Sequence, residues 1–240
     1  MATSTRRALE RARTREQIIE TALRILESEG VAALTIRRIA TDIEYAAPIV
    51  YQYFANKDAL VLELVTRGYQ LLRNDIQLAS EEPGIDRRIL RLASEYVRFA
   101  GEHPHLYKVM NDTTVDANAR QRAAQPGTEI LKELLASWAS EHDVELTDFD
   151  EACEIVWGML YGIASLGHLG TIGNERARRL AVQAFRAILS GWSNEAPRPS
   201  SPYGGRSTDQ CPTCDSRLDS RTAATTKTPS VTSPDHVDTA

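Results

Sequence analysis

The segment 35–57, TIRRIATDIEYAAPIVYQYFANK, constrains the fold more than any other part of the chain. Behind Thr35, a residue type that caps helix N-termini, apolar residues recur at helical spacing for about two turns. The periodicity breaks at 42–45, and a second short helix is expected over 47–53. Pro48 falls in its first turn, where the missing N–H of a proline costs no hydrogen bond. Two short helices joined by a tight turn form a helix-turn-helix unit, whose second helix reads the major groove of DNA.

Several residue types at fixed offsets make this region resemble the DNA-binding region of the TetR family of bacterial transcription regulators. The matching positions are Ile39, Ala40, Pro48, Tyr51, Tyr53, Phe54, Asn56 and Lys57. The resemblance runs from about Arg11 to Leu64. Two positions depart from the family pattern, which usually has Gly at the position of Glu44 and Ser or Thr at that of Ala46. A non-glycine residue in the left-handed region costs about 1–2 kcal/mol, and a lost N-cap costs about 1 kcal/mol.

The resemblance implies double-stranded operator DNA as the partner and assigns two kinds of contact. The positions similar to the family's phosphate contacts are Arg37, Tyr51, Tyr53 and Lys57. The candidates for contact with base edges or thymine methyl groups are Ala47, Pro48, Ile49 and Gln52. The alternative interpretation of these positions is an ordinary exposed polar face.

Charge is unevenly distributed along the chain of 240 residues, which is 42% hydrophobic and 25% charged. The formal net charge of −5 argues against a general polyanion binder. Residues 1–57 carry 9 Lys and Arg against 7 Asp and Glu, whereas residues 58–193 carry 14 against 20. Positive charge therefore gathers at the end that holds the helix-turn-helix, which suits phosphate contact there.

The remaining chain predicts an all-α fold with four parts. We expect a basic arm over 1–13, a helix-turn-helix domain over 14–57, a regulatory and dimerisation domain over 58–193, and a disordered tail over 194–240. The arm is expected either to be solvated and frayed or to lie along DNA. A helix from 58 to about 80 links the two domains mechanically.

Turn signals divide the regulatory domain further. The segment 112–125 is polar and poorly periodic, which predicts a loop with a short helix, and Pro126 is expected to start the next helix. Thr147 is the expected N-cap of a long helix that runs to about Gly170. Asn174 is expected to cap the last helix.

The last two helices carry apolar residues on more than one face, which predicts a homodimer interface. The candidate interface residues are Gly158, Gly162, Gly167, Phe185 and Leu189, the glycines because small residues permit close helix approach. The segments HPHLYKVM and WGMLYGIASL are similar to a C-terminal domain group of TetR-type regulators named for a Trp…His-Gly motif. Tyr161 stands here at the His position.

Aromatic and flexible apolar residues of this domain are either plain core or the lining of a small-molecule pocket. The tentative pocket residues are Tyr107, Met110, Trp157 and Tyr161, and they predict a small, largely apolar effector. No nucleophile elbow or glycine-rich phosphate loop is present, so we predict no catalytic residues and no enzyme. The expected function is a transcription repressor released by its effector. The alternative is a helical dimeric ligand-binding or scaffold protein without operator binding.

The cellular compartment and the cofactor content are predicted from hydropathy, the N-terminal sequence and the cysteines. No run of 18 apolar residues is present and the N-terminus lacks a secretion signal, so we expect a cytoplasmic protein without membrane association. Cys153, Cys211 and Cys214 do not form a disulfide framework. Cys211 and Cys214 have metal-ligand spacing, but a structural zinc site needs four ligands, so no metal and no cofactor are predicted.

Overall fold

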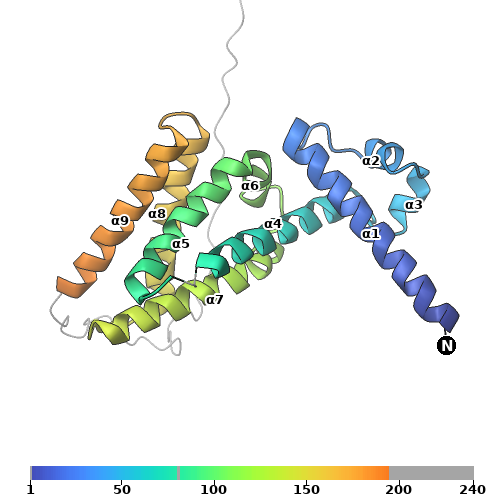
Figure 1. Cartoon of the computed structure of the whole chain (residues 1–240). Helices are drawn as coiled ribbons and strands as arrows, with labels where there is room; N and C mark the ends of the chain where they lie inside the picture. The colour runs from blue at the N-terminus through green and yellow to red at the C-terminus, as the bar shows by residue number, and fades with distance from the viewer. Residues whose placement is uncertain (1, 80–81, 195–240) are drawn as a thin grey trace, which may run out of the picture. The chain divides into compact units, whose positions relative to one another are not determined.

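The structure, a computed structural model, describes residues 2–79 and 82–194. Every regular element in these ranges is a helix, which confirms the all-α fold class (Figure 1). The predicted tail lies outside the described residues except for Asn194, and so do Cys211 and Cys214. Within the described part of the chain, no helix is both long enough and apolar enough to span a bilayer.

Three helices form the N-terminal domain: α1 (Ala2–Glu29), α2 (Ile36–Asp42) and α3 (Ala47–Tyr51). Helix α1 packs against α2, and α2 packs against α3. The periodic apolar residues of α1 are buried at this contact, among them Ile18, Ile25 and Leu26. The segment 1–13, predicted as an arm, is helical from Ala2 onward. No Pro or Gly interrupts the chain before Gly30, so nothing ends the helix before that point.

Helix α4 (Lys57–Ala79) connects this domain to the rest of the chain. The Asn56 side-chain oxygen accepts a hydrogen bond from the Ala59 N–H at 2.8 Å and so caps the start of α4. The first half of α4 is tied to α1 by Arg67–Glu16, at 3.1 Å, and by a second ion pair, Arg15–Glu63. Helix α4 also packs against α5, α6 and α7, so it contacts both domains.

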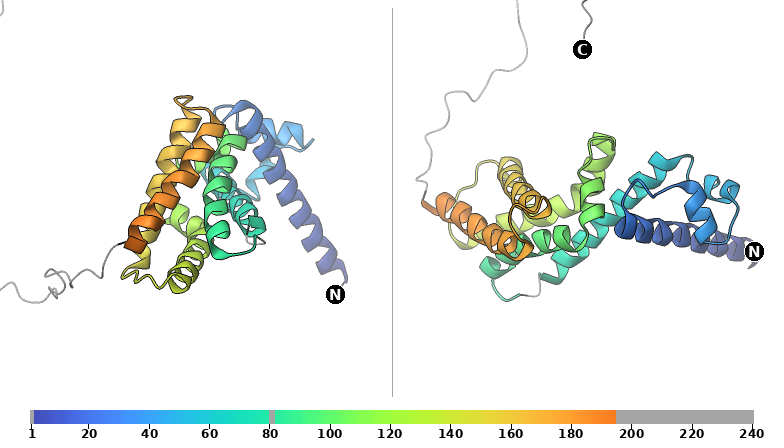
Figure 2. Two further views of the ribbon diagram at one scale, coloured as in Figure 1. Left: turned by 60° about the vertical axis from the view of Figure 1, so that its left-hand side comes forward. Right: turned by 90° about the horizontal axis from the view of Figure 1, so that it is seen from above.

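Five helices make up the C-terminal domain: α5 (Ile85–Glu102), α6 (Pro104–Met110), α7 (Ala117–Glu141), α8 (Phe149–His168) and α9 (Asn174–Asn194). Helix α5 packs against α4, α7, α8 and α9, and it lies beside α8 and α9 in both views of Figure 2. Its apolar stripe is buried accordingly, from Ile85 and Ile89 to Phe99.

Two predictions about helix starts were wrong. Helix α7 begins at Ala117, not at Pro126, and passes through Pro126. Asp116 caps it by accepting a hydrogen bond from the Ala119 N–H at 2.7 Å, and the alanines that follow favour helix. The N-cap of α8 is Asp148 and not Thr147, because the Asp148 carboxylate accepts hydrogen bonds from two backbone N–H groups of the first turn.

Candidate functional site

The first turn of α2 holds Arg38 in place and leaves Arg37 exposed. The Thr35 hydroxyl accepts a hydrogen bond from the Arg38 backbone N–H at 3.2 Å, so Thr35 is the N-cap. The Arg38 guanidinium pairs with Asp42 at 3.1 Å. Hydrogen bonds from Arg24 and Arg38 hold the pKa of the Asp42 carboxyl below its usual value. Arg37 therefore extends from a helix start that is fixed by other side chains.

The turn between α2 and α3 has the strain that its sequence predicts. Glu44 adopts a φ of +59°, in the left-handed region where glycine is favoured. The Tyr45 N–H donates to the Ala40 carbonyl at 2.9 Å and closes the end of α2. Ala46 precedes α3 in extended conformation and offers no side-chain cap. The helix-turn-helix geometry is thus reached despite both departures from the family pattern.

Helix α3 separates a buried face from an exposed one. Val50 is fully buried and Phe54, just beyond the helix, is also in the core. The helix ends at Tyr51, two residues earlier than predicted. The remaining predicted contact residues of this segment are exposed or partly exposed: Ala47, Pro48, Ile49, Tyr51, Gln52 and Tyr53. Tyr51 exposes 54% of its surface. The exposed face can therefore meet a DNA groove without any change in the domain core.

Lys57 has a second role that its sequence position does not show. Its Nζ donates a hydrogen bond to the backbone carbonyl of Val31 at 3.1 Å and so ties the start of α4 to the loop after α1. A Lys ammonium has three donors, so phosphate contact remains compatible with this bond. Lys57 is partly buried.

Sequence reasoning missed Tyr45 as a candidate contact. Tyr45 stands in the turn directly before α3 and exposes 45% of its surface. It lies in the break between two periodic segments, where a search for helical faces assigns no side to any residue. A large aromatic residue in the short turn directly before the recognition helix is the signal that could have identified it.

The candidate dimer residues fall into two groups. Positions 158 and 162 on α8 face open space, because a Cβ atom built on either glycine meets nothing within 4 Å. Gly167 instead approaches α9 of the same protomer, where its Cβ would lie 3.2 Å from the Ala177 Cβ. Phe185 and Leu189 are buried in the protomer's own core and so are unavailable to a partner.

An exposed apolar stripe surrounds the two open glycines. The large hydrophobic residues on α8 and its C-cap that remain exposed are Ile155, Tyr161, Leu166 and Leu169. With Gly158 and Gly162, the positions 155, 158, 162, 166 and 169 recur every three or four residues and so share one helix face. These residues, called the α8 stripe below, are therefore the candidate dimer interface.

An apolar cavity lies among α4, α5, α7 and α8, with a volume of about 20 Å³, roughly the space of one water molecule. Its lining residues are Tyr69, Leu72, Arg73, Ile76, Leu92, Tyr96, Gly127, Leu131, Trp157 and Leu160. Among the four predicted pocket residues, Trp157 is part of this lining.

The other three predicted pocket residues lie elsewhere. Tyr107 is buried, and its hydroxyl contacts the Tyr96 hydroxyl at 3.3 Å. Burial raises the pKa of Tyr107 to about 12. Met110 is buried on α6, and Tyr161 exposes 46% of its surface on α8. Tyr107 therefore supports the cavity wall from behind, through Tyr96.

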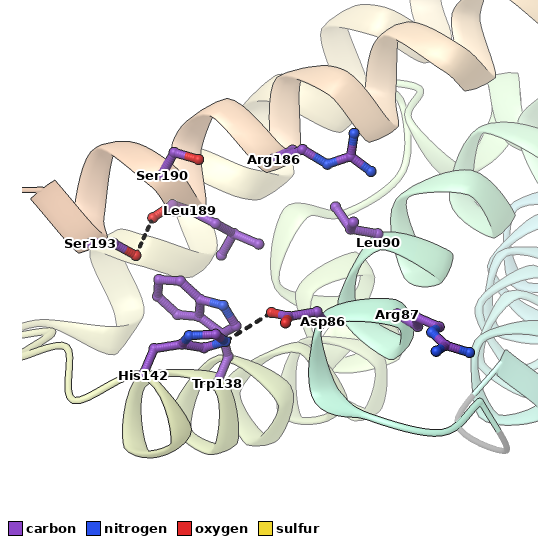
Figure 3. Close-up of a pocket in the computed structure, with 9 residues that line it drawn as sticks. All are labelled: Asp86, Arg87, Leu90, Trp138, His142, Arg186, Leu189, Ser190 and Ser193. Atoms are coloured by element: carbon purple, nitrogen blue, oxygen red, sulfur yellow. Dashed lines mark hydrogen bonds and ion pairs between the residues drawn. The ribbon is translucent and has the colours of Figure 1, made fainter.

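A second and wider hollow of about 430 Å³ lies at the contact of α5, α7 and α9. Figure 3 shows Trp138 and His142 on one side of it and Leu90 and Arg186 on the other. His142 Nε2 contacts the Asp86 carboxylate at 2.9 Å across its floor. None of the residues that line this hollow belongs to α4, so it does not touch the helix that reaches the N-terminal domain.

Comparisons with known proteins match both domains. Residues 18–64 match the family model described as bacterial regulatory proteins, tetR family. Residues 89–190 match the model described as tetracyclin repressor-like, C-terminal domain. The uncharacterized HTH-type transcriptional regulator YobS of Bacillus subtilis (strain 168) is 28% identical over 95 residues, which cover 40% of this chain and 50% of YobS. The match thus spans half the length of that regulator.

Solved structures share the fold over most of the described chain. A protein of unknown function from Rhodococcus sp. RHA1 superposes with a TM-score of 0.65 at 20% identity, covering 75% of this chain and 95% of that one. The TetR family transcriptional regulator PfmR from Thermus thermophilus gives a TM-score of 0.54 at 17% identity, covering 72% and 97%.

Fold and site together define an all-helical transcription regulator with an N-terminal helix-turn-helix and a C-terminal helical domain. Both domains match models of one family, and a helix-turn-helix regulator is among the relatives. The chain belongs to the TetR family of bacterial transcription regulators.

Proposed function

We propose that the protein binds operator DNA as a homodimer and represses transcription until a small molecule releases it. The observation that carries DNA binding is the burial pattern of α3 and its C-cap: Val50 is in the core, while Pro48, Tyr51 and the C-cap Gln52 are exposed. Arg37 on α2 and Lys57 at the start of α4 supply positive charge for phosphates. Gln52 can make bidentate contact with adenine, and the apolar Pro48 and Ile49 suit thymine methyl groups.

Dimerisation is supported by the α8 stripe, which leaves several large apolar side chains uncovered in the protomer. Two glycines in its centre have open space above them, so a second helix can approach the backbone closely. A two-fold dimer would set two recognition helices about one DNA turn apart, roughly 34–36 Å, on a palindromic operator.

Release by an effector is supported by the way α4 runs from the DNA-binding domain to the apolar cavity. Its first turn holds Lys57, which bonds the loop after α1, and its later turns contribute Tyr69, Leu72, Arg73 and Ile76 to the apolar cavity. A ligand that fits one packing of this cavity can therefore tilt α4 and change the distance between the two recognition helices. Coupling of this kind is typically about 5- to 150-fold in operator affinity, and it must be reciprocal.

The test is a gel shift with the DNA that flanks the protein's own gene. Specific retardation that withstands competitor DNA and weakens steeply with salt supports the proposal. The second candidate, a helical ligand-binding or scaffold protein, is favoured by the strained Glu44 and the uncapped Ala46. A dimer that binds small molecules but retards no flanking fragment would establish that candidate instead.

A further inference from the structure

We propose that the effector is an amphipathic weak acid, with an apolar body in the cavity among α4, α5, α7 and α8 and an anionic group on Arg73. This inference rests on the proposed function, because it names the chemical class of the ligand for that same cavity.

Arg73 is the unusual member of the cavity lining. Its Nε is buried and has no hydrogen-bond partner within the described residues. Two other arginines of α4 and α5 have a carboxylate partner: Arg67 pairs with Glu16 at 3.1 Å, and Arg98 pairs with Asp75 at 3.0 Å. A buried charged donor without a partner is unfavourable, and a carboxylate or phosphate is the group that satisfies a guanidinium best. The described lining residues include no Asp or Glu, so that anion has to come with the ligand.

The rest of the lining indicates an apolar body. Leu72, Ile76, Leu131 and Leu160 offer hydrocarbon, and Trp157 offers an aromatic surface. The two tyrosines are uncharged at neutral pH, and burial raises the pKa of both Tyr69 and Tyr96 further above the ordinary value. The Tyr96 hydroxyl also already has a neighbour in the Tyr107 hydroxyl. One fixed positive charge in an apolar cavity matches a ligand with one negative end.

The cavity has to widen before such a ligand can enter. Helix α7 contains a weak point at which it can bend to open the cavity. Pro126 lies inside α7 and removes one backbone donor from the helix ladder, which weakens the helix locally. The next residue, Gly127, lines the cavity, and a Cβ built there meets nothing within 4 Å. The first turns of α7, from Ala117 to Pro126, can therefore swing outward while Leu131 stays packed.

The hollow in Figure 3 provides the matched control. It also carries arginines, Arg87 and Arg186, but both are exposed, and α4 contributes nothing to it. A probe that is attracted to arginines in general will respond to Arg186→Gln. A probe held in the cavity will respond to Arg73→Gln.

The experiment measures binding of two acid–alcohol pairs by calorimetry at neutral pH, without DNA: decanoate against decanol, and naphthoate against naphthalenemethanol. Wild-type protein should bind at least one acid about 10- to 100-fold more tightly than its alcohol, the usual effect of a charge-assisted hydrogen bond. Arg73→Gln should remove this preference and leave the alcohol affinity unchanged. Arg73→Lys should restore part of it, which also shows that the variant site is folded. Arg186→Gln should bind like wild type.

Equal binding of acid and alcohol, no acid binding at all, or a preference that survives Arg73→Gln would each overturn the inference. So would a preference that Arg186→Gln abolishes. The gel shift of ligand-free protein separates this failure from failure of the proposed function. Retarded DNA with no acid preference refutes the ligand class alone, whereas an Arg73-dependent acid preference without retarded DNA refutes operator binding alone.

Discussion

Gly68 on α4 and Met110 on α6 approach so closely that a Cβ atom at position 68 would lie 2.5 Å from the Met110 sulfur. The same Cβ would lie 3.2 Å from the Leu106 Cγ. Both side chains are fully buried and have little room to retreat. This contact sets the position along α4 at which α6 packs. That position lies between the cavity and the DNA-binding domain.

We predict that Gly68→Ala destabilises the fold by about 1–3 kcal/mol, the usual cost of overpacking a core. The matched control is Gly191→Ala on α9, where the new Cβ meets open space and the helix gains up to about 1 kcal/mol. Urea unfolding of both variants measures the difference. Equal stability of the two would mean that α4 and α6 are not in tight contact.

Further contacts join the start of α6 to the end of α1. His103 Nδ1 lies 3.3 Å from Glu27 Oε1, a distance for an ion pair, although the carboxylate oxygen has no hydrogen bond with good geometry. His105 Nδ1 contacts the Glu27 backbone carbonyl at 3.0 Å. Glu27→Ala removes the side-chain contact with His103 and keeps the backbone carbonyl that His105 contacts. It should increase amide hydrogen exchange at the end of α1 and in α6, while α9 keeps its protection. Unchanged exchange in α6 would show that this corner is held by other contacts.

Glu44→Gly should stabilise the protein, because it relieves a left-handed residue. The relief of about 1–2 kcal/mol is reduced by the greater freedom of glycine in the unfolded chain, which leaves about 0.5–1 kcal/mol. In a chain of this size the melting temperature should rise by about 2–4 °C per kcal/mol. Asp143→Gly, at a φ of +54°, is the control and should gain less, because Asp tolerates this region better. A lower melting temperature for Glu44→Gly would contradict the strain argument.

Helical spacing was sufficient to predict the helix-turn-helix from the sequence. Thr35 caps a helix, and Val50 and Phe54 are buried four residues apart, so each role can be recognised from near neighbours in the sequence. Spacing could not decide which apolar residues of α8 and α9 face the protomer's own core. Phe185 and Gly162 both lie on helices with apolar character on several sides, yet Phe185 is buried and Gly162 is open. Only the tertiary packing of α9 against α5 and α8 separates them.

The cavity was the hardest part to predict. Tyr107 and Trp157 are equally plausible lining residues in sequence. In the structure, the short helix α6 places Tyr107 behind Tyr96. Arg73 gave no signal, since an arginine on a long amphipathic helix is ordinarily solvated. Its significance depends on the burial of one nitrogen, which is a property of the tertiary structure.

We predict that Gly162→Glu produces monomers, because it places a charge in the centre of the α8 stripe. Ser140→Glu, at an exposed position on α7, is the matched control and should leave the assembly unchanged. Sedimentation velocity at several concentrations distinguishes monomer from dimer. A Gly162→Glu protein that sediments like wild type would place the dimer interface on another face.

The most direct test of the central claim is an operator titration by fluorescence anisotropy across a range of salt concentrations. Tyr51→Phe removes one exposed hydroxyl and should weaken binding to all operator variants alike, whereas Gln52→Ala should change which variants are preferred. Lys57→Ala should also reduce the salt slope by about one per half-site. Lys108→Ala and Gln121→Ala, at exposed positions on α6 and α7, should match wild type. If Tyr51→Phe, Gln52→Ala and Lys57→Ala all bind every operator variant as wild type does, α3 is not the DNA reader.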